Sequence, residues 1–258
     1  MPDLSPATLN GIRCAADIIR GCRQGAVLTG AGISTPSGIP DFRSTNSGLW
    51  EKYDPFEVAS LNAFRYRHEK FFEWIRPLAL KMIAAQPNEA HFGITKLQQA
   101  GYVQTVITQN IDGLHQRAGT TNVLEVHGSM QTLTCISCFQ QINAEGVVEA
   151  YFESGEIPRC PHCGEVLKPD IILFGEQLPA RTWLKALEAA RQCDLMIVAG
   201  SSLEVLPVAG LPMRALEKGA HLVLINKSET YLDVRADVSF LADVIDIIPR
   251  LVEEVLSG

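Results

Sequence analysis

Short apolar segments alternate with helical segments along most of this chain, and this alternation limits its possible folds more than any other feature. Strands are predicted at residues 26–29, 103–108, 123–126, 194–199, 221–226 and 238–240. Helices are predicted at residues 7–23, 89–100, 181–192, 207–218 and 241–256. Strands that alternate with helices build a mostly parallel sheet covered on both faces, and ligands bind outside the carboxyl ends of its strands.

Glycine-rich or polar motifs directly follow four of the predicted strands. These motifs are Gly30, Gln109-Asn110, Gly200-Ser201-Ser202 and Asn226. In a parallel sheet they are expected to converge on one nucleotide site. The glycines of the first turn would let backbone N–H groups approach a pyrophosphate. Thr35 replaces the third glycine of the dehydrogenase pattern, and no acidic residue ends a second strand ~20 residues later, so hydride transfer is disfavoured.

Two segments interrupt the alternation. Residues 46–86 are aromatic with a helical pattern, and residues 130–167 carry two Cys-x-x-Cys pairs. The spacing of Cys135, Cys138, Cys160 and Cys163 is that of a zinc ribbon. Four thiolates complete a tetrahedron and leave no position for water, so the predicted Zn²⁺ is structural. Redox-active or unligated cysteines are the alternative.

The composition excludes several classes of function. Apolar residues make up 47% of the 258 residues, and a net charge of −7 argues against a broad nucleic-acid surface. No apolar run approaches the ~20 residues that span a bilayer, and no basic region followed by an apolar block marks a secretory signal. Seven cysteines, four of them in the paired motif, fit a reducing compartment, so a cytoplasmic location is expected.

Position favours one of the six histidines, His127, as a general base. It follows a predicted strand, where it would face the cleft, and it precedes Gly128 and the cysteine-rich segment. A neutral imidazole near pH 7 is well matched to removing a proton from a hydroxyl. His115 follows a turn and is predicted to be a structural hydrogen-bonding residue. Asn110 and Asp112 precede a helix, so they either cap it or bind ribose hydroxyls and a carboxamide.

Taken together, these residues closely resemble the sirtuins, the NAD-dependent protein-lysine deacylases. The resemblance runs from about Leu28 to Val244, through the motifs GAGIS, PDFR, TQNIDGLH, HG, FGE, GSS and IN and the four cysteines. It implies an α/β fold: a Rossmann-type doubly wound parallel sheet with a smaller domain made of a helical module and a zinc ribbon. The implied segments are 1–45, 87–129 and 168–258 for the large domain, 46–86 for the helical module and 130–167 for the zinc ribbon.

The resemblance also implies the site residues. NAD, a consumed co-substrate, would contact Gly30, Ala31, Gly32, Ile33, Asp41, Phe42, Arg43, Gln109, Asn110, Ile111, Asp112, His127, Gly200, Ser201, Ser202, Asn226 and Val244. The catalytic residues would be His127, Asn110 and Asp112. The substrate peptide would add as a strand between residues 175–176 and 202–205. Its acyl-lysine would enter a tunnel, and the substrate contacts would be Phe42, Ile172, Phe174, Gly175, Glu176 and Val205.

The implied reaction removes an acetyl group from lysine. The acetyl oxygen attacks the anomeric carbon of the nicotinamide ribose, His127 acts as base on the ribose hydroxyls, and the products are nicotinamide, free lysine and O-acetyl-ADP-ribose. The branch that prefers succinyl groups carries a Tyr-x-x-Arg pair, whereas this chain has Tyr66-x-x-Glu69, so deacetylation is expected. The expected partners are acetylated proteins or peptides; the oligomeric state is left open.

Three alternatives and two departures accompany this interpretation. A mono-ADP-ribosyltransferase would use the same NAD site, a scaffold would bind acetylated partners without turnover, and a longer-chain lysine deacylase would differ only in acyl preference. Lys168 precedes Pro169 where the family commonly has Arg, and Ala242 replaces a frequent glycine before the predicted adenine contact at Val244. The combination of Asn110, Asp112 and His127 argues against the scaffold, because a binding protein needs no base.

Overall fold

The larger part of the molecule is a six-stranded sheet. The computed structural model describes residues 4–42 and 48–258. Its large sheet has the order β3-β2-β1-β7-β8-β9, and every neighbouring pair is parallel. The strands are β1 (Gly25–Thr29), β2 (Val103–Thr108), β3 (Val123–Glu125), β7 (Leu195–Ala199), β8 (His221–Asn226) and β9 (Val238–Leu241). β1 and β7 are buried throughout, as expected for central strands covered on both faces.

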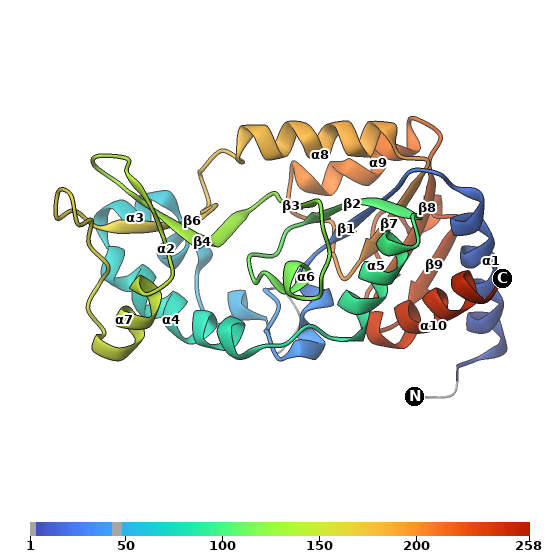
Figure 1. Cartoon of the computed structure of the whole chain (residues 1–258), viewed down its shortest axis with the longest axis horizontal. Helices are drawn as coiled ribbons and strands as arrows, with labels where there is room; N and C mark the ends of the chain where they lie inside the picture. The colour runs from blue at the N-terminus through green and yellow to red at the C-terminus, as the bar shows by residue number, and fades with distance from the viewer. Residues whose placement is uncertain (1–3, 43–47) are drawn as a thin grey trace.

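Helices cover both faces of this sheet, which confirms the doubly wound fold (Figure 1). One face packs against α1 (Pro6–Gly21), α5 (Glu89–Gln99) and α10 (Val244–Ser257), and the other packs against α8 (Ala180–Gln192) and α9 (Leu211–Leu216). The short α6 (Leu114–Arg117) follows β2. Successive residues of β1 enter opposite cores: Val27 packs with the α1 and α10 layer, and Leu28 packs with the α8 and α9 layer.

The smaller part lies at the end of the molecule away from both termini (Figure 1). It combines the helices α2 (Pro55–Val58), α3 (Leu61–Tyr66), α4 (His68–Ala84) and α7 (Val147–Ser154) with a three-stranded antiparallel sheet of order β5-β4-β6. The strands of this sheet are β4 (Gly128–Cys135), β5 (Gln141–Asn143) and β6 (Leu167–Ile171). Two contacts join α4 to α7: the rings of Phe72 and Tyr151 pack with centroids 5.4 Å apart, and the Tyr151 hydroxyl donates to the carbonyl of Phe72 at 2.8 Å. The 3₁₀ turns are Ala31–Ile33, Thr35–Ser37, Leu49–Glu51, Val208–Gly210 and Asp233–Arg235.

Two local predictions differ from the structure, at the start of α10 and at residues 207–218. Within α4 the helix runs through Pro77, with buried Trp74 and Leu78 on either side of it. α10 begins at Val244 because Leu241 pairs with β8 and Asp243 accepts from the amide of Ile245 as N-cap. The helix predicted at 207–218 is a 3₁₀ turn followed by α9.

The small sheet extends past the segment predicted as the zinc ribbon. β4 begins at Gly128 and β6 ends at Ile171, beyond the expected bounds of 130–167. The boundary expected between residues 45 and 46, where the large domain would meet the helical module, lies outside the described residues. The division into five segments therefore stays a prediction.

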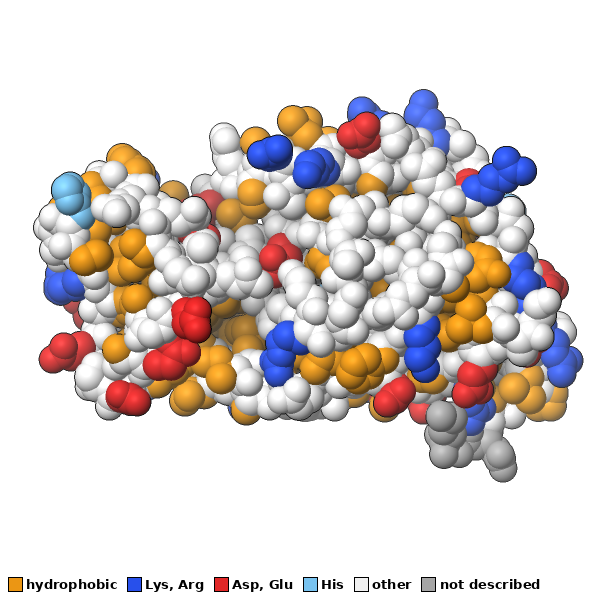
Figure 2. All heavy atoms as spheres, viewed as in Figure 1, with side chains coloured by type: hydrophobic (Ala, Val, Ile, Leu, Met, Phe, Trp, Pro, Cys, Tyr) orange, Lys and Arg blue, Asp and Glu red, His pale blue; other side chains and the backbone are white. Residues whose placement is uncertain are grey.

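The surface is mixed in charge. Lysine and arginine side chains are scattered among acidic ones on the face seen in Figure 2. Within residues 4–42 and 48–258, no helix has the length and apolar character needed to cross a bilayer.

Candidate active site

A cavity of about 940 Å³ lies where the carboxyl edge of the large sheet meets the smaller part. The residues directly after β1, β2, β7 and β8 all line it, which confirms the expected convergence of the four motifs. Every residue predicted to contact NAD or substrate lines this cavity, apart from Ile33 and Arg43. The Ile33 side chain is fully buried in the core beneath the sheet, and Arg43 lies outside the described residues.

The glycine turn after β1 packs closely against the backbone of the turn after β7. The amide of Gly32 donates to the carbonyl of Gly200 at 2.8 Å, and that of Gly30 donates to Ala199 at 3.3 Å. A Cβ on Gly32 would lie 2.8 Å from the Cα of Gly200, and Gly200 itself has φ +64°. The amides of Gly30 and Gly32 are therefore occupied within the protein, and the approach of other backbone N–H groups of this turn to a pyrophosphate stays a prediction. The missing side chains of the two glycines let the turns after β1 and β7 meet at the cavity.

Ser34 joins the two polar residues of the loop after β2. Its hydroxyl donates to Asp112 Oδ2 at 2.7 Å and accepts from Asn110 Nδ2 at 3.0 Å. Asp112 Oδ1 accepts from the amide of Leu114 at 2.9 Å, so Asp112 both starts α6 and lines the cavity. Burial raises the pKa of Asp112, against hydrogen bonds from Leu114 and Ser34 that lower it. Ser34 was not predicted as a site residue, although it ends the GAGIS motif.

His127 is held with a defined orientation between β3 and β4. Its Nδ1 is 3.1 Å from the carbonyl of Gln109. A carbonyl can only accept, so Nδ1 carries the proton and the lone pair of the neutral ring lies on Nε2. The next residue, Gly128, has φ +79°, and a Cβ there would lie 2.0 Å from the carbonyl oxygen of Asp170. Only glycine therefore lets β4 leave His127 in this position while pairing with β6.

Asn226 offers an amide donor to a ligand. Its Oδ1 accepts from the amide of Ser201 at 2.8 Å, which fixes the side chain at the end of β8. Its Nδ2 is buried and has no hydrogen-bond partner among the residues that the structure describes. Such a donor is costly unless a ligand satisfies it. The Nδ2 donor fits a phosphate or hydroxyl oxygen of a dinucleotide, and the Asp112 carboxylate fits a ribose hydroxyl.

The cavity continues into an apolar arm beneath the helical module. Trp50 stacks on Phe42 with ring centroids 5.1 Å apart and on Trp74 at 5.8 Å. Leu78 and Met82 of α4 line the same arm. The lining contributed by Trp50, Trp74, Leu78 and Met82 was indicated in the sequence only by the aromatic, helical pattern of residues 46–86.

The segment after β6 forms one wall of the cavity. The amide of Phe174 donates to the carbonyl of Ala59 at 2.9 Å, and its carbonyl accepts from Leu61 at 3.0 Å. The amide of Ile172 donates to the carbonyl of His127 at 2.8 Å. Residues 172–174 are thus tied both to the helical module and to the general-base candidate.

The four cysteines form a second candidate site, for a metal. Their sulfur atoms all lie within 4.8 Å of one another. The amides of Ser137 and Cys138 donate to Cys135 Sγ at 3.4 and 3.5 Å, as expected where backbone donors stabilise a thiolate ligand. Four sulfur ligands in this arrangement fit a tetrahedral structural Zn²⁺.

His115 is a structural residue, as predicted. Its Nε2 lies 3.0 Å from the hydroxyl of Thr29, which itself donates to Thr108 Oγ1 at 2.9 Å. The ring of His91 lies 5.0 Å away, centroid to centroid, and both rings are buried. Burial lowers the pKa of His91 to about 4; burial and the neighbouring His91 lower the pKa of His115 to about 3.

This buried histidine pair predicts a loss of stability in acid. The unfolded chain binds protons at both residues below pH ~6.5, whereas the folded chain keeps them neutral down to about pH 4 and 3. The free energy of unfolding should therefore fall as pH drops below ~6.5, by on the order of 1 kcal/mol per unit for each histidine. Urea midpoints at pH 7.5 and 5 measure the effect. His115→Gln should flatten the dependence, while exposed His221→Gln should not.

Comparison with known proteins identifies the family. Residues 30–207 match the model of the Sir2 family. The chain is 46% identical over 245 residues to the NAD-dependent protein deacylase 2 of Archaeoglobus fulgidus, covering 95% of this chain and 96% of that protein. It is 40% identical over 241 residues to the NAD-dependent protein deacetylase of Sulfurisphaera tokodaii, covering 93% and 94%.

A solved structure agrees over nearly the whole fold. A Sir2 variant with a deacetylated p53 peptide and 3′-O-acetyl ADP-ribose is 39% identical to this chain. Its TM-score is 0.87, with 93% of this chain and 96% of that chain covered. These matches confirm the resemblance to the sirtuins: the chain belongs to the Sir2 family.

Proposed function

We propose that this protein is an NAD-dependent protein-lysine deacetylase. It would transfer the acetyl group of an acetyl-lysine to ADP-ribose and release nicotinamide, free lysine and O-acetyl-ADP-ribose. The observation that carries this proposal is the position of His127. Its base nitrogen is defined by the Gln109 carbonyl, and its cavity joins the loops at the sheet edge to an apolar arm. The names of the Sir2 relatives and the ligands of the Sir2 complex support the same reaction.

Each side chain has a part in this reaction. NAD supplies the ADP-ribose acceptor and the nicotinamide leaving group. Asn110 and Asp112 would hold its ribose and carboxamide, since Ser34 fixes both side chains at the cavity wall. His127 Nε2 would take a proton from a ribose hydroxyl. Phe42 and Trp50 would exclude water from the acyl group.

The substrate would bind as an extended peptide. The cavity is lined by Gly175, Glu176, Ser202, Glu204 and Val205, and a peptide strand between these two segments would place its acyl-lysine in the apolar arm. We expect acetylated proteins as partners, a cytoplasmic location from the cysteine usage, and no nucleic-acid partner. The oligomeric state is not part of the proposal.

Nicotinamide release tests this proposal. Release from NAD should require an acetyl-lysine peptide and should match deacetylated product one for one, as measured by chromatography and mass spectrometry. Release without the peptide, with ADP-ribose appearing on protein, would assign the chain to the mono-ADP-ribosyltransferases. Tight peptide binding with no turnover would support the scaffold instead.

The apolar arm favours a second activity, removal of longer acyl chains. Trp74, Leu78 and Met82 of α4 line it as well as Phe42 and Trp50, an apolar surface suited to a longer acyl chain. The Archaeoglobus relative is itself named a deacylase. Peptides with acyl chains of two to fourteen carbons should therefore all be substrates. Any increase in kcat/KM with acyl chain length should stop at the length that fills the arm.

A blocking variant tests this second activity. Leu78→Trp should lower kcat/KM for the longest chains at least about tenfold while leaving acetyl-lysine within about twofold, because only long chains reach that position. Leu80→Trp, at an exposed position of the same helix, is the control. Equal loss for all chain lengths would show that the arm does not hold the acyl chain.

A further inference from the structure

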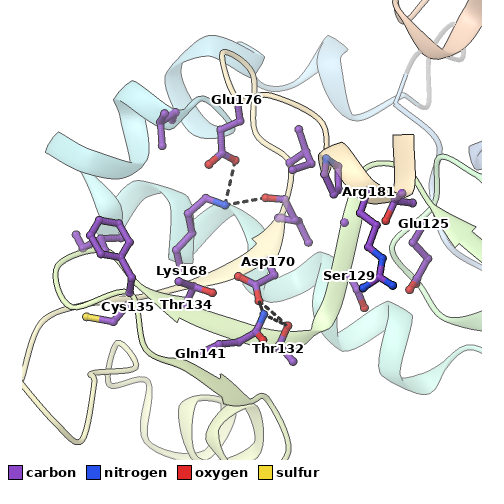
Figure 3. Close-up of a pocket in the computed structure, with 18 of the residues that line it drawn as sticks. Glu125, Ser129, Thr132, Thr134, Cys135, Gln141, Lys168, Asp170, Glu176 and Arg181 are labelled. Carbon is purple, nitrogen blue, oxygen red and sulfur yellow. Dashed lines mark hydrogen bonds and ion pairs between the residues drawn. The ribbon is translucent and has the colours of Figure 1, made fainter. Parts of the chain in front are cut away.

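A second cavity, of about 950 Å³, lies against the wall formed by the segment after β6. It is lined by β4, β6 and the start of α8 (Figure 3). Both cavities include Ile171, Ile172 and Glu176 in their lining. The segment 171–176 is therefore the partition between them, and groups in the second cavity can set its conformation.

Lys168 contacts this partition from the second cavity. Its ammonium is 3.0 Å from Glu176 Oε2 (Figure 3). It also donates to the carbonyls of Ile171 at 2.7 Å and Pro169 at 3.1 Å. The side chains of Lys168 and Glu176 are only 12% and 18% exposed. Three acceptors match the three donors of an ammonium group, so the position is fully satisfied.

The Glu176 carboxylate closes the turn that carries the partition. Its Oε2 also accepts from the amide of Leu173 at 2.8 Å, and the amide of Glu176 donates back to the carbonyl of Leu173 at 3.0 Å. Gly175 within this turn has φ +87°. A nearly buried carboxylate holding such a turn depends on a nearby cation, because an unpaired charge there would be costly.

We propose that Lys168 is a positioning residue for the substrate peptide, a role that rests on the proposed function. Together with Glu176, it holds residues 171–176 in the conformation in which their backbone edge can pair with a peptide strand. The same contacts keep Phe174, which lines only the first cavity, on the acyl-lysine side of the partition. Lys168 itself lines only the second cavity, so it acts through the segment and touches neither NAD nor substrate.

The test compares kinetic parameters for the two substrates. Lys168→Met should raise KM for an acetyl-lysine peptide roughly tenfold, the scale of a lost charge-assisted hydrogen bond. KM for NAD and kcat should stay within about twofold, because Lys168 does not line the cavity of the NAD loops and the His127 ring, and the bond between Ile172 and His127 joins backbone atoms only. Lys168→Arg keeps the cation and should restore most of the peptide affinity. Lys185→Met is the control: Lys185 lines the same cavity without an ion pair among the described residues.

Other outcomes contradict the inference. A lysine with a merely structural role would, when replaced, lower Tm and shift both KM values and kcat together. An unchanged peptide KM in Lys168→Met, or an Arg variant no better than Met, would also overturn it. Glu176→Gln is a second variant, expected to raise peptide KM alone; unfolding of both variants would mean that the pair serves folding rather than positioning. Absence of turnover by the unmodified protein would instead contradict the proposed function itself.

Discussion

Replacing His127 with alanine is expected to lower the rate of peptide deacetylation about 10³-fold, the scale of a lost general base. The variant should still fold and bind the acetyl-lysine peptide, because the Gln109 carbonyl that loses its partner lies at the cavity and can bond to water. Mass spectrometry of the peptide at saturating NAD measures the rate. Calorimetric titration of the peptide measures the binding.

His221→Ala is the matched control for this substitution. His221 begins β8, at the end of the strand opposite to Asn226 and the cavity, and its Nδ1 lies 3.1 Å from Asp237 Oδ1 at the surface. The His221→Ala substitution should leave the rate unchanged. A His127 variant within tenfold of the parent would assign the base to another group, for which Asp112 in the same cavity is a candidate.

Removing the metal is expected to unfold the small sheet and abolish activity. Structural zinc contributes roughly 10–16 kcal/mol in small modules, far more than the few apolar side chains around the cysteines can replace. Activity should fall with it, because β4 begins directly after His127 and β6 leads into the substrate wall. Elemental analysis should give one zinc per chain, and circular dichroism after chelation should show lost strand signal.

The cysteine variants separate this effect from general thiol chemistry. Cys138→Ser should behave as the chelated protein, whereas Cys14→Ser, at an exposed position on α1, should retain zinc, fold and activity. A chelated protein that keeps its small sheet would show that apolar packing alone holds this region. Re-addition of Zn²⁺ should restore both the strand signal and turnover.

The sequence predicted the parts of this molecule that depend on local pattern and topology. β1 and β7 are short, mostly apolar and followed by glycine, so their burial and the position of their turns could be predicted from the chain alone. Because all six strands are parallel, the motifs after them had to share one edge. The position of His127 follows from the same rule, without knowledge of any side-chain contact.

The remaining features depend on contacts between residues distant in the chain. The amides of Gly30 and Gly32 are occupied because a second turn, after β7, packs against them. Ser34 could not be singled out, since its role is to join Asn110 to Asp112 across the cavity wall. No local pattern places one side chain against another in this way. The extension of the predicted tunnel to Leu78 and Met82 and the Lys168–Glu176 pair escaped prediction for the same reason.

The order of the strands has a consequence for how the chain folds during its synthesis. β1 lies between β2 and β7, and all of the small domain's sheet and helices lie between β1 and β7 in the chain. While the ribosome makes that intervening stretch, one edge of β1, a strand that is buried throughout in the folded protein, has no partner. The high contact order of the β1–β7 pairing makes its closure slow and exposes the nascent chain to aggregation. The large domain is therefore expected to complete its fold only after the last strands have left the ribosome, and chaperones should bind the partly made chain.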